Sequence, residues 1–157
     1  SIVIIPSLPQ KGLGNQIEGI SRAISQLYKV KGVRILLPSM FSSPYSPLTN
    51  RRLPPSYLVD TDAMIRGLRA IGIAVDAALP LNYTSAAGRR TLVPVIEPNI
   101  SHGFVTKSSL AVEMAQARSP LVSLQMRMKG LRVSREVKVA VLTSWRPSDR
   151  IRALADA

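Results

Sequence analysis

The sequence predicts an α/β fold of the Rossmann-like, doubly wound type, built on a mainly parallel sheet. An apolar run at residues 2–5 is followed by a glycine-containing turn, an amphipathic run at residues 17–28 and a second apolar run at residues 33–38. A similar alternation returns at residues 57–76. Apolar strands that alternate with helical patterns are typical of β-α-β units and hence of a parallel sheet.

The turn between the first strand and the first helix reads Lys-Gly-Leu-Gly-Asn-Gln at residues 11–16. Gly12 and Gly14 allow positive φ angles and let a ligand approach the backbone, while the first N–H groups of the helix point outward with the positive end of its dipole. Such a turn suits a phosphate. A purely structural interpretation stays open beside this one: the glycines make a tight turn, and the side chain of Asn15 caps the helix.

Two common nucleotide motifs do not fit this turn. The dinucleotide fingerprint needs a third glycine, where Ile17 stands, and an acidic residue after the second strand, where the chain reads Leu-Pro-Ser at residues 37–39. A Walker-type phosphate loop needs Gly-Lys-Ser or Gly-Lys-Thr, which is missing here. The sequence therefore disfavours an NAD site and excludes a Walker site.

The first helix is strongly patterned. Its four large apolar residues fall on one face, namely Ile17, Ile20, Ile24 and Leu27. Glu18 is expected in the first turn, and Gly32 is expected to stop the helix before the second strand. The glycine turn is then expected at the carboxyl edge of the parallel sheet, where ligands bind in such folds.

The remaining elements follow with less regularity. Prolines and serines with Arg51 and Arg52 predict a long loop at residues 39–55, then a short strand at 57–59. Asp60 or Thr61 should cap a helix that runs through residue 70, before a stop at Gly72 and a strand at 73–76.

The second half is expected to start with a strand at residues 91–96 and a helix at 107–118. The residues expected to face inward from that helix are Leu110, Val112, Met114 and Ala115. Residues 121–143 are left undecided, because 137–142 fit a strand by composition and could equally open a helix. Ser148 should cap a last helix, and sequons stand at Asn82 and Asn99.

Composition limits the classes of function. The 157 residues, 46% of them hydrophobic, predict one folded domain over 1–157, and no apolar run reaches the roughly 18 residues of a membrane span. The start of the chain lacks the charged residues of a signal peptide. Because there is no cysteine and only one histidine, His102, we expect no disulfide, no metal site and no catalytic triad.

Charge is the most unusual global property: 21 Lys and Arg stand against 9 Asp and Glu, which gives +12 and a pI near 11.1. Residues 118–152 hold nine of the basic residues and only Glu136 and Asp149 as acids. This stretch could face nucleic acid, anionic lipid or an acidic protein, or could be a solvated surface. Nucleic acid is disfavoured, because only 4% of the residues are aromatic and no binding motif is present.

The Gly-Leu-Gly-Asn-Gln run of residues 12–16, between an apolar strand and a helix, resembles the opening of the GDP-fucose protein O-fucosyltransferase family. Residues 145–156, which begin Trp-Arg-Pro-Ser, resemble the segment and helix that close that family's first domain. The resemblance implies one half of a two-domain glycosyltransferase of the B type, with GDP-fucose as donor, a protein as acceptor, no metal cofactor and a secretory compartment. It assigns donor binding to Gly12, Gly14, Asn15 and Gln16, with Asn15 on the diphosphate side.

In that family a strand with a His-x-Arg motif and a second domain come next, and neither occurs in these residues. We therefore expect the chain to be inactive alone. The competing interpretation is a non-catalytic relic that serves as a basic accessory subunit, with an acidic protein partner, in an organelle such as the mitochondrion. The missing cysteine, the high pI and the missing second domain favour the relic, and the intact glycine turn of residues 14–16 favours the enzyme. Acceptor, compartment and oligomeric state stay open.

Overall fold

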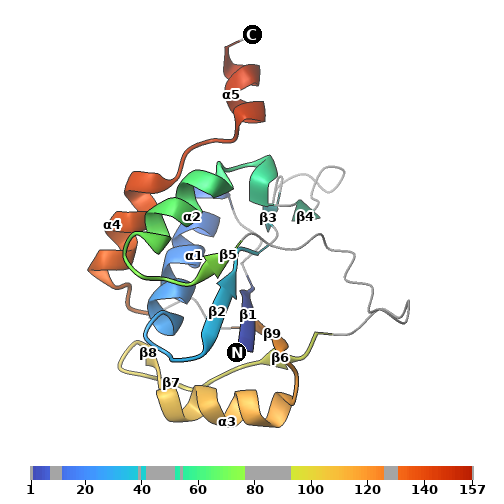
Figure 1. Cartoon of the computed structure of the whole chain (residues 1–157), viewed down its shortest axis with the longest axis vertical. Helices are drawn as coiled ribbons and strands as arrows, with labels where there is room; N and C mark the ends of the chain where they lie inside the picture. Colours follow the sequence, from blue (N-terminus) through green and yellow to red (C-terminus); the bar gives the residue numbers. More distant parts are fainter. Residues whose placement is uncertain are drawn as a thin grey trace.

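Five parallel strands form the central sheet of the computed structural model, in the order β5-β2-β1-β9-β6 (Figure 1). The strands are β1 (Ile2–Pro6), β2 (Val33–Leu36), β5 (Val75–Asp76), β6 (Val95–Ile96) and β9 (Leu121–Leu124). The structure describes residues 2–7, 12–38, 40–41, 52–53, 55–76, 93–125 and 131–156. In the middle of the sheet, Ile4 pairs with Ile35 on one side and Val122 on the other, and all three are buried. The predicted α/β, Rossmann-like fold with a parallel sheet is confirmed.

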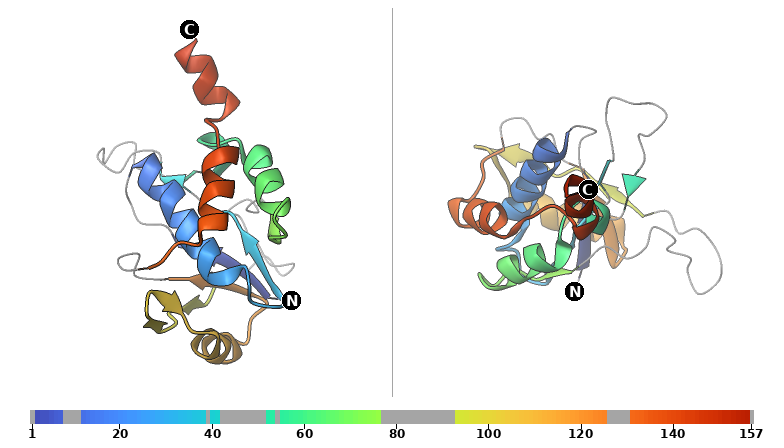
Figure 2. Two further views of the ribbon diagram at one scale, coloured as in Figure 1. Left: turned by 90° about the vertical axis from the view of Figure 1, so that its left-hand side faces the viewer. Right: turned by 90° about the horizontal axis from the view of Figure 1, so that it is seen from above.

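Helices cover both sides of this sheet. Figures 1 and 2 show α1 (Leu13–Leu27), α2 (Thr61–Arg69) and α4 (Arg135–Ser144) together on one side, and α3 (Lys107–Ala117) on the other side, below β6 and β9. The predicted inner face of α1 is confirmed, because the side chains at its four large apolar positions are at most 4% exposed: Ile17, Ile20, Ile24 and Leu27. Burial of such a stripe is what stabilises a helix against a sheet.

The sequence also predicted α2 correctly. Asp60 is its N-cap, and the Oδ1 atom of Asp60 accepts a hydrogen bond from Ala63 N at 3.0 Å. Gly72 follows the helix with a φ of +86°, a conformation that a side chain would disfavour. Ser148 likewise caps α5 (Asp149–Ala155), since its Oγ accepts from Ile151 N at 3.3 Å.

The residues that were undecided between strand and helix form α4. Val137, Ala140 and Val141 are its buried residues, and their spacing of three and four positions is that of one helix face. Two expectations about the elements after α1 were wrong. Residues 57–59 are not a strand: η1 (Pro55–Tyr57) is a 3-10 helix, because the N–H groups of Leu58 and Val59 bond back to Pro55 O.

The second wrong expectation concerns the inner face of α3. Leu110 is buried and Met114 packs against the core, but Val112 is 53% exposed and Ala115 is exposed as well. Leu110 and Met114 are four positions apart and share a face, whereas Val112 lies half a turn away from both. A face of alternating positions fits a strand rather than a helix.

Smaller elements complete the molecule. Two antiparallel pairs join β3 (Met40–Phe41) to β4 (Arg52–Leu53) and β7 (Ile100–Ser101) to β8 (Phe104–Val105). α5 projects from the body and buries no residue (Figure 1). Most of the predicted loop at 39–55 and the sequon at Asn82 lie outside the described residues, whereas Asn99 is exposed just before β7. Within the described ranges, no helix is both long and apolar enough to span a bilayer.

Candidate functional site: the amino end of α1

The amino end of α1 lies at the carboxyl edge of the sheet. β1 ends at Pro6, and the next residue, Ser7, donates its N–H to Leu124 O at the end of β9, at 2.8 Å. The chain then resumes, in the described part, at Gly12, directly before α1. Ligands of open α/β sheets bind at this edge, so the glycine turn occupies the position that the sequence predicted.

Three backbone N–H groups at this helix end make no helical hydrogen bond. The first helical hydrogen bond of α1 runs from Gln16 N to Gly12 O at 3.0 Å, so the N–H groups of Leu13, Gly14 and Asn15 precede the helical ladder. The side chain of Asn15 and the backbone of Gly14 are exposed, and the first turn holds no acidic residue. Free N–H groups at the positive end of a helix dipole attract an anion.

The glycines of this turn act differently from the sequence-based expectation. Gly12 has a φ of −58°, and Gly14 lies inside the helix, so neither adopts the positive φ that we expected. Their contribution is space: a Cβ atom added at Gly12 or at Gly14 would meet nothing within 4 Å. A ligand can therefore approach the backbone here without contacting a side chain at either position.

Asn15 does not cap the helix. Gly12 is the N-cap, no side chain makes a cap hydrogen bond, and Asn15 is the third helical residue. The helix thus begins four residues earlier than predicted, so Glu18 lies beyond its first turn. The carboxylate of Glu18 forms an ion pair with Arg22, at 2.9 Å. Because Asn15 has no capping role, its exposed amide is available to contact a ligand.

Gln16 differs from the other three predicted site residues. Its side chain is fully buried, whereas Gly14 and Asn15 are exposed and Gly12 is half-buried. The structure therefore brings Gly12, Gly14 and Asn15 together at the surface, whereas the side chain of Gln16 is buried in the protein interior. Lys11, the preceding residue of the motif, lies outside the described ranges.

A hollow of about 280 Å³ opens between α1 and α4, beside this helix end. Gly14 contributes to both the hollow and the first turn of α1. The lining residues come from two segments, namely Gly14, Ile17, Glu18 and Ser21 of α1 and Val133, Lys138, Leu142 and Trp145 of α4 and its flanks. Sequence reasoning missed this hollow, because its two walls are more than 100 residues apart in the chain.

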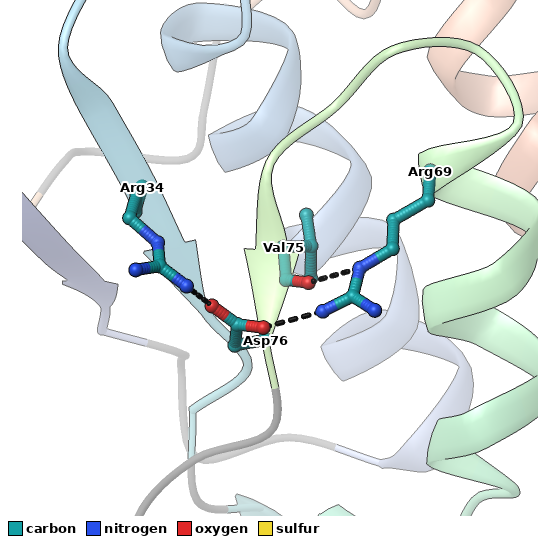
Figure 3. A network of polar contacts seen from close by, with 4 residues as sticks. All are labelled: Arg34, Arg69, Val75 and Asp76. Atoms are coloured by element: carbon teal, nitrogen blue, oxygen red, sulfur yellow. Dashed lines mark hydrogen bonds and ion pairs between the residues drawn. The ribbon is translucent and has the colours of Figure 1, made fainter.

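A second polar cluster stands at the far edge of the sheet. Figure 3 shows the carboxylate of Asp76, at the end of β5, between the guanidinium groups of Arg34 and Arg69, and it forms an ion pair with each of them. Arg69 Nε also donates to Val75 O at 3.1 Å. These contacts join α2 and β2 to the edge strand β5, which gives the cluster a structural role.

The basic stretch at residues 118–152 does not form one face. Arg127 and Lys129 lie outside the described residues, and the others are exposed. Arg118 ends α3, on the other side of the sheet from α4. Near the C-terminal end, Arg150 stacks on the ring of Tyr57 at 4.3 Å, and Arg152 pairs with Asp149.

Among the described residues, no group of three or more His, Asp or Glu side chains is placed to hold a metal ion. His102 is exposed in the turn between β7 and β8. The amino end of α1 and the hollow beside it remain as candidate ligand sites among the described residues. Comparison of the chain with models of protein families, with curated proteins and with solved structures finds no match in any of the three.

Proposed function

We propose that the chain is the N-terminal, donor-facing domain of an O-fucosyltransferase-like glycosyltransferase and that the diphosphate of GDP-fucose binds at the amino end of α1. One observation carries the proposal: α1 starts at the carboxyl edge of a parallel sheet with the N–H groups of three successive residues ahead of its first hydrogen bond. GDP-fucose is proposed as the ligand because residues 12–16 resemble the opening of the sequences of that family.

Each residue of the turn has a distinct role in this proposal. The N–H groups of Leu13, Gly14 and Asn15 donate to phosphate oxygens, and the exposed Asn15 amide adds a side-chain donor. Gly12 and Gly14 keep the approach open, since neither has a side chain. The net charge of +12 raises the local concentration of an anionic ligand.

The chemistry of transfer limits what these residues can do. Negative charge develops on the departing GDP, and it must be met by preorganised donors in a site that excludes water. The amino end of α1 supplies donors but is exposed to solvent. In the proposed enzyme it binds and orients the donor, and an arginine of the second domain stabilises the leaving group.

Isothermal calorimetry with GDP tests this proposal. We expect a dissociation constant no tighter than roughly the millimolar range, about −4 kcal/mol, because the 157 residues would supply only one wall of the proposed cleft. Asn15→Ala should reduce the measured heat, whereas Asn99→Ala, a change at another exposed asparagine, should leave it unchanged. Equal heats for the parent and Asn15→Ala would contradict the proposal.

A further inference from the structure

We propose that the chain has a second ligand site, a pocket at the carboxyl-terminal end of α1 that binds a small aromatic anion. The pocket has a volume of about 380 Å³, which lies within the range of about 300–1,000 Å³ that is usual for small-molecule sites. Three segments line it: the end of α1, the stretch from β8 into α3, and the residue before α4.

This pocket is far from the glycine turn. α1 starts at the carboxyl edge of the sheet and runs for 15 residues, which is about 22 Å of helix. It ends at the opposite edge, where Gly32 O accepts a hydrogen bond from Ile2 N at 2.8 Å. Figure 1 shows the hairpin of β7 and β8 beside this lower end of α1. The inference therefore does not depend on the proposed function.

Hydrogen bonds between the three segments fix the walls of the pocket. The buried side chain of Gln26 accepts from Val105 N at 2.7 Å and donates to Arg132 O at 2.9 Å. Ser134 N donates to Ser25 Oγ at 2.9 Å. A pocket whose walls are already held in place loses less conformational freedom when a ligand binds, which favours affinity.

Two lysines give the pocket a positive charge. Lys107 is the first residue of α3, and Lys29 Nζ lies 5.4 Å from the centroid of the Tyr28 ring, a distance typical of a cation–π contact. Neither lysine forms an ion pair with an acid of the described ranges, and the described residues that line the pocket include no acid. An anion is therefore the ligand whose charge this pocket complements.

A pair of hydroxyl groups adds a neutral donor. Tyr28 OH and Ser134 Oγ lie 3.2 Å apart, and both residues line the pocket. One hydroxyl donates to the other, so the accepting hydroxyl still has a proton that it can donate to a ligand oxygen. Carboxylate and phosphate oxygens accept such bonds.

An exposed aromatic side chain favours a ligand with a ring. The side chain of Phe104, on β8, is 43% exposed, and Val30 is half-buried in the same lining. Aromatic rings attract one another in offset or edge-to-face arrangements, and a ring placed here would remove apolar surface of Phe104 from water. A ring that bears a carboxylate or a phosphate thus matches both the apolar and the charged part of the lining.

Titrations of the 157-residue chain test this site with two probes, phenylacetate and phenyl phosphate. We expect both probes to shift the backbone amide cross-peaks of Lys29, Val105 and Lys107 in a saturable way. Benzyl alcohol has the ring without the charge and should bind about tenfold more weakly or worse, because it loses the charge-assisted contacts. Inorganic pyrophosphate has the charge without the ring, and it should leave the cross-peaks of Val105 and Lys107 in place.

Variants separate the pocket from the general charge of the chain. Lys107→Gln should weaken phenylacetate binding about fivefold, the effect of one partly exposed charge pair. Lys31→Gln is the matched control, since Lys31 is an exposed lysine near the same helix end that does not line the pocket. Phe104→Leu, which keeps an apolar side chain but no ring, should also weaken binding, whereas Val112→Ala at an exposed position of α3 should not.

The outcomes are independent of those for the diphosphate site. Cross-peaks of Val105 and Lys107 that move with neither probe overturn the pocket, whatever GDP does at the amino end of α1. Equal weakening by Lys107→Gln and Lys31→Gln overturns it too, because general charge would then explain the binding. Benzyl alcohol or pyrophosphate that binds here as tightly as phenyl phosphate would refute the preference for an aromatic anion.

Discussion

Gly67 of α2 lies directly against Ser144, the last residue of α4: a Cβ atom added at Gly67 would be 2.3 Å from Ser144 Cβ and 2.7 Å from Ser144 Oγ. Real Cβ atoms essentially never come so close to another atom, so the missing side chain is what allows the two helices to approach at this point. α4 also forms one wall of the hollow beside α1. The contact therefore positions the candidate site as well as the core.

We predict that Gly67→Ala destabilises the protein although alanine is the better helix former. Overpacking costs about 1–3 kcal/mol, and the gain in helix propensity offsets at most about 1 kcal/mol of it. Urea unfolding followed by circular dichroism measures the difference. Gly14→Ala is the matched control, since a Cβ there meets nothing within 4 Å, and equal stability of the two variants would refute the close contact.

A buried glutamine joins three segments at the other end of α1. Gln26 Oε1 accepts from Val105 N at 2.7 Å, and Gln26 Nε2 donates to Arg132 O at 2.9 Å. The side chain is only 7% exposed. It therefore holds the segments before α3 and before α4 against α1, which fixes where α4 begins.

Replacing Gln26 by alanine should leave the buried N–H of Val105 and the part-buried carbonyl of Arg132 without their partner. Each unsatisfied group costs about 1–3 kcal/mol, so the free energy of unfolding should fall by several kcal/mol. Hydrogen exchange at the amide of Val105 gives a local readout and should accelerate strongly. Gln116→Ala on the exposed side of α3 serves as control, and unchanged exchange at Val105 would show that Gln26 does not protect it.

The sequence predicts those elements of the fold whose structure is decided by residues close together in the chain. The strand, turn and helix at the start of the chain were predictable, because the large apolar residues of α1 repeat every three to four positions, which is the period of a helix and not of a strand. The start of α1 was misplaced, because glycine and asparagine are both good N-cap residues and only packing decides between Gly12 and Asn15.

Long-range packing decides the rest. The run of residues 137–142 fits a strand by composition, yet burial of Val137, Ala140 and Val141 against α1 and α2 makes it helical. The hollow lined by Ile17 and Trp145 could not be read from the sequence, since it exists only once α4 lies antiparallel to α1. The phosphate-binding candidate was visible because all its donors come from one short segment.

We expect the 157-residue chain by itself to transfer no fucose from GDP-fucose to any peptide. The loss of a single preorganised donor typically lowers the rate by a factor of about 100 to 1,000, and the proposed arginine and facing wall belong to a second domain. Mass spectrometry of the incubated peptides detects the added sugar. Turnover by the chain alone that disappears in Asn15→Ala would show that these residues hold a complete active site.

The most direct test of the diphosphate site is a titration of the parent and of Gly14→Ala with GDP, followed by the backbone amide cross-peaks. The account predicts that the largest shifts in the parent fall on Leu13, Gly14 and Asn15. In Gly14→Ala, which should be at least as stable as the parent, the added methyl group should weaken binding severalfold. Shifts that concentrate instead at the amino end of α3, around Ser108 and Ser109, or equal affinity of parent and variant, would contradict a diphosphate site at α1.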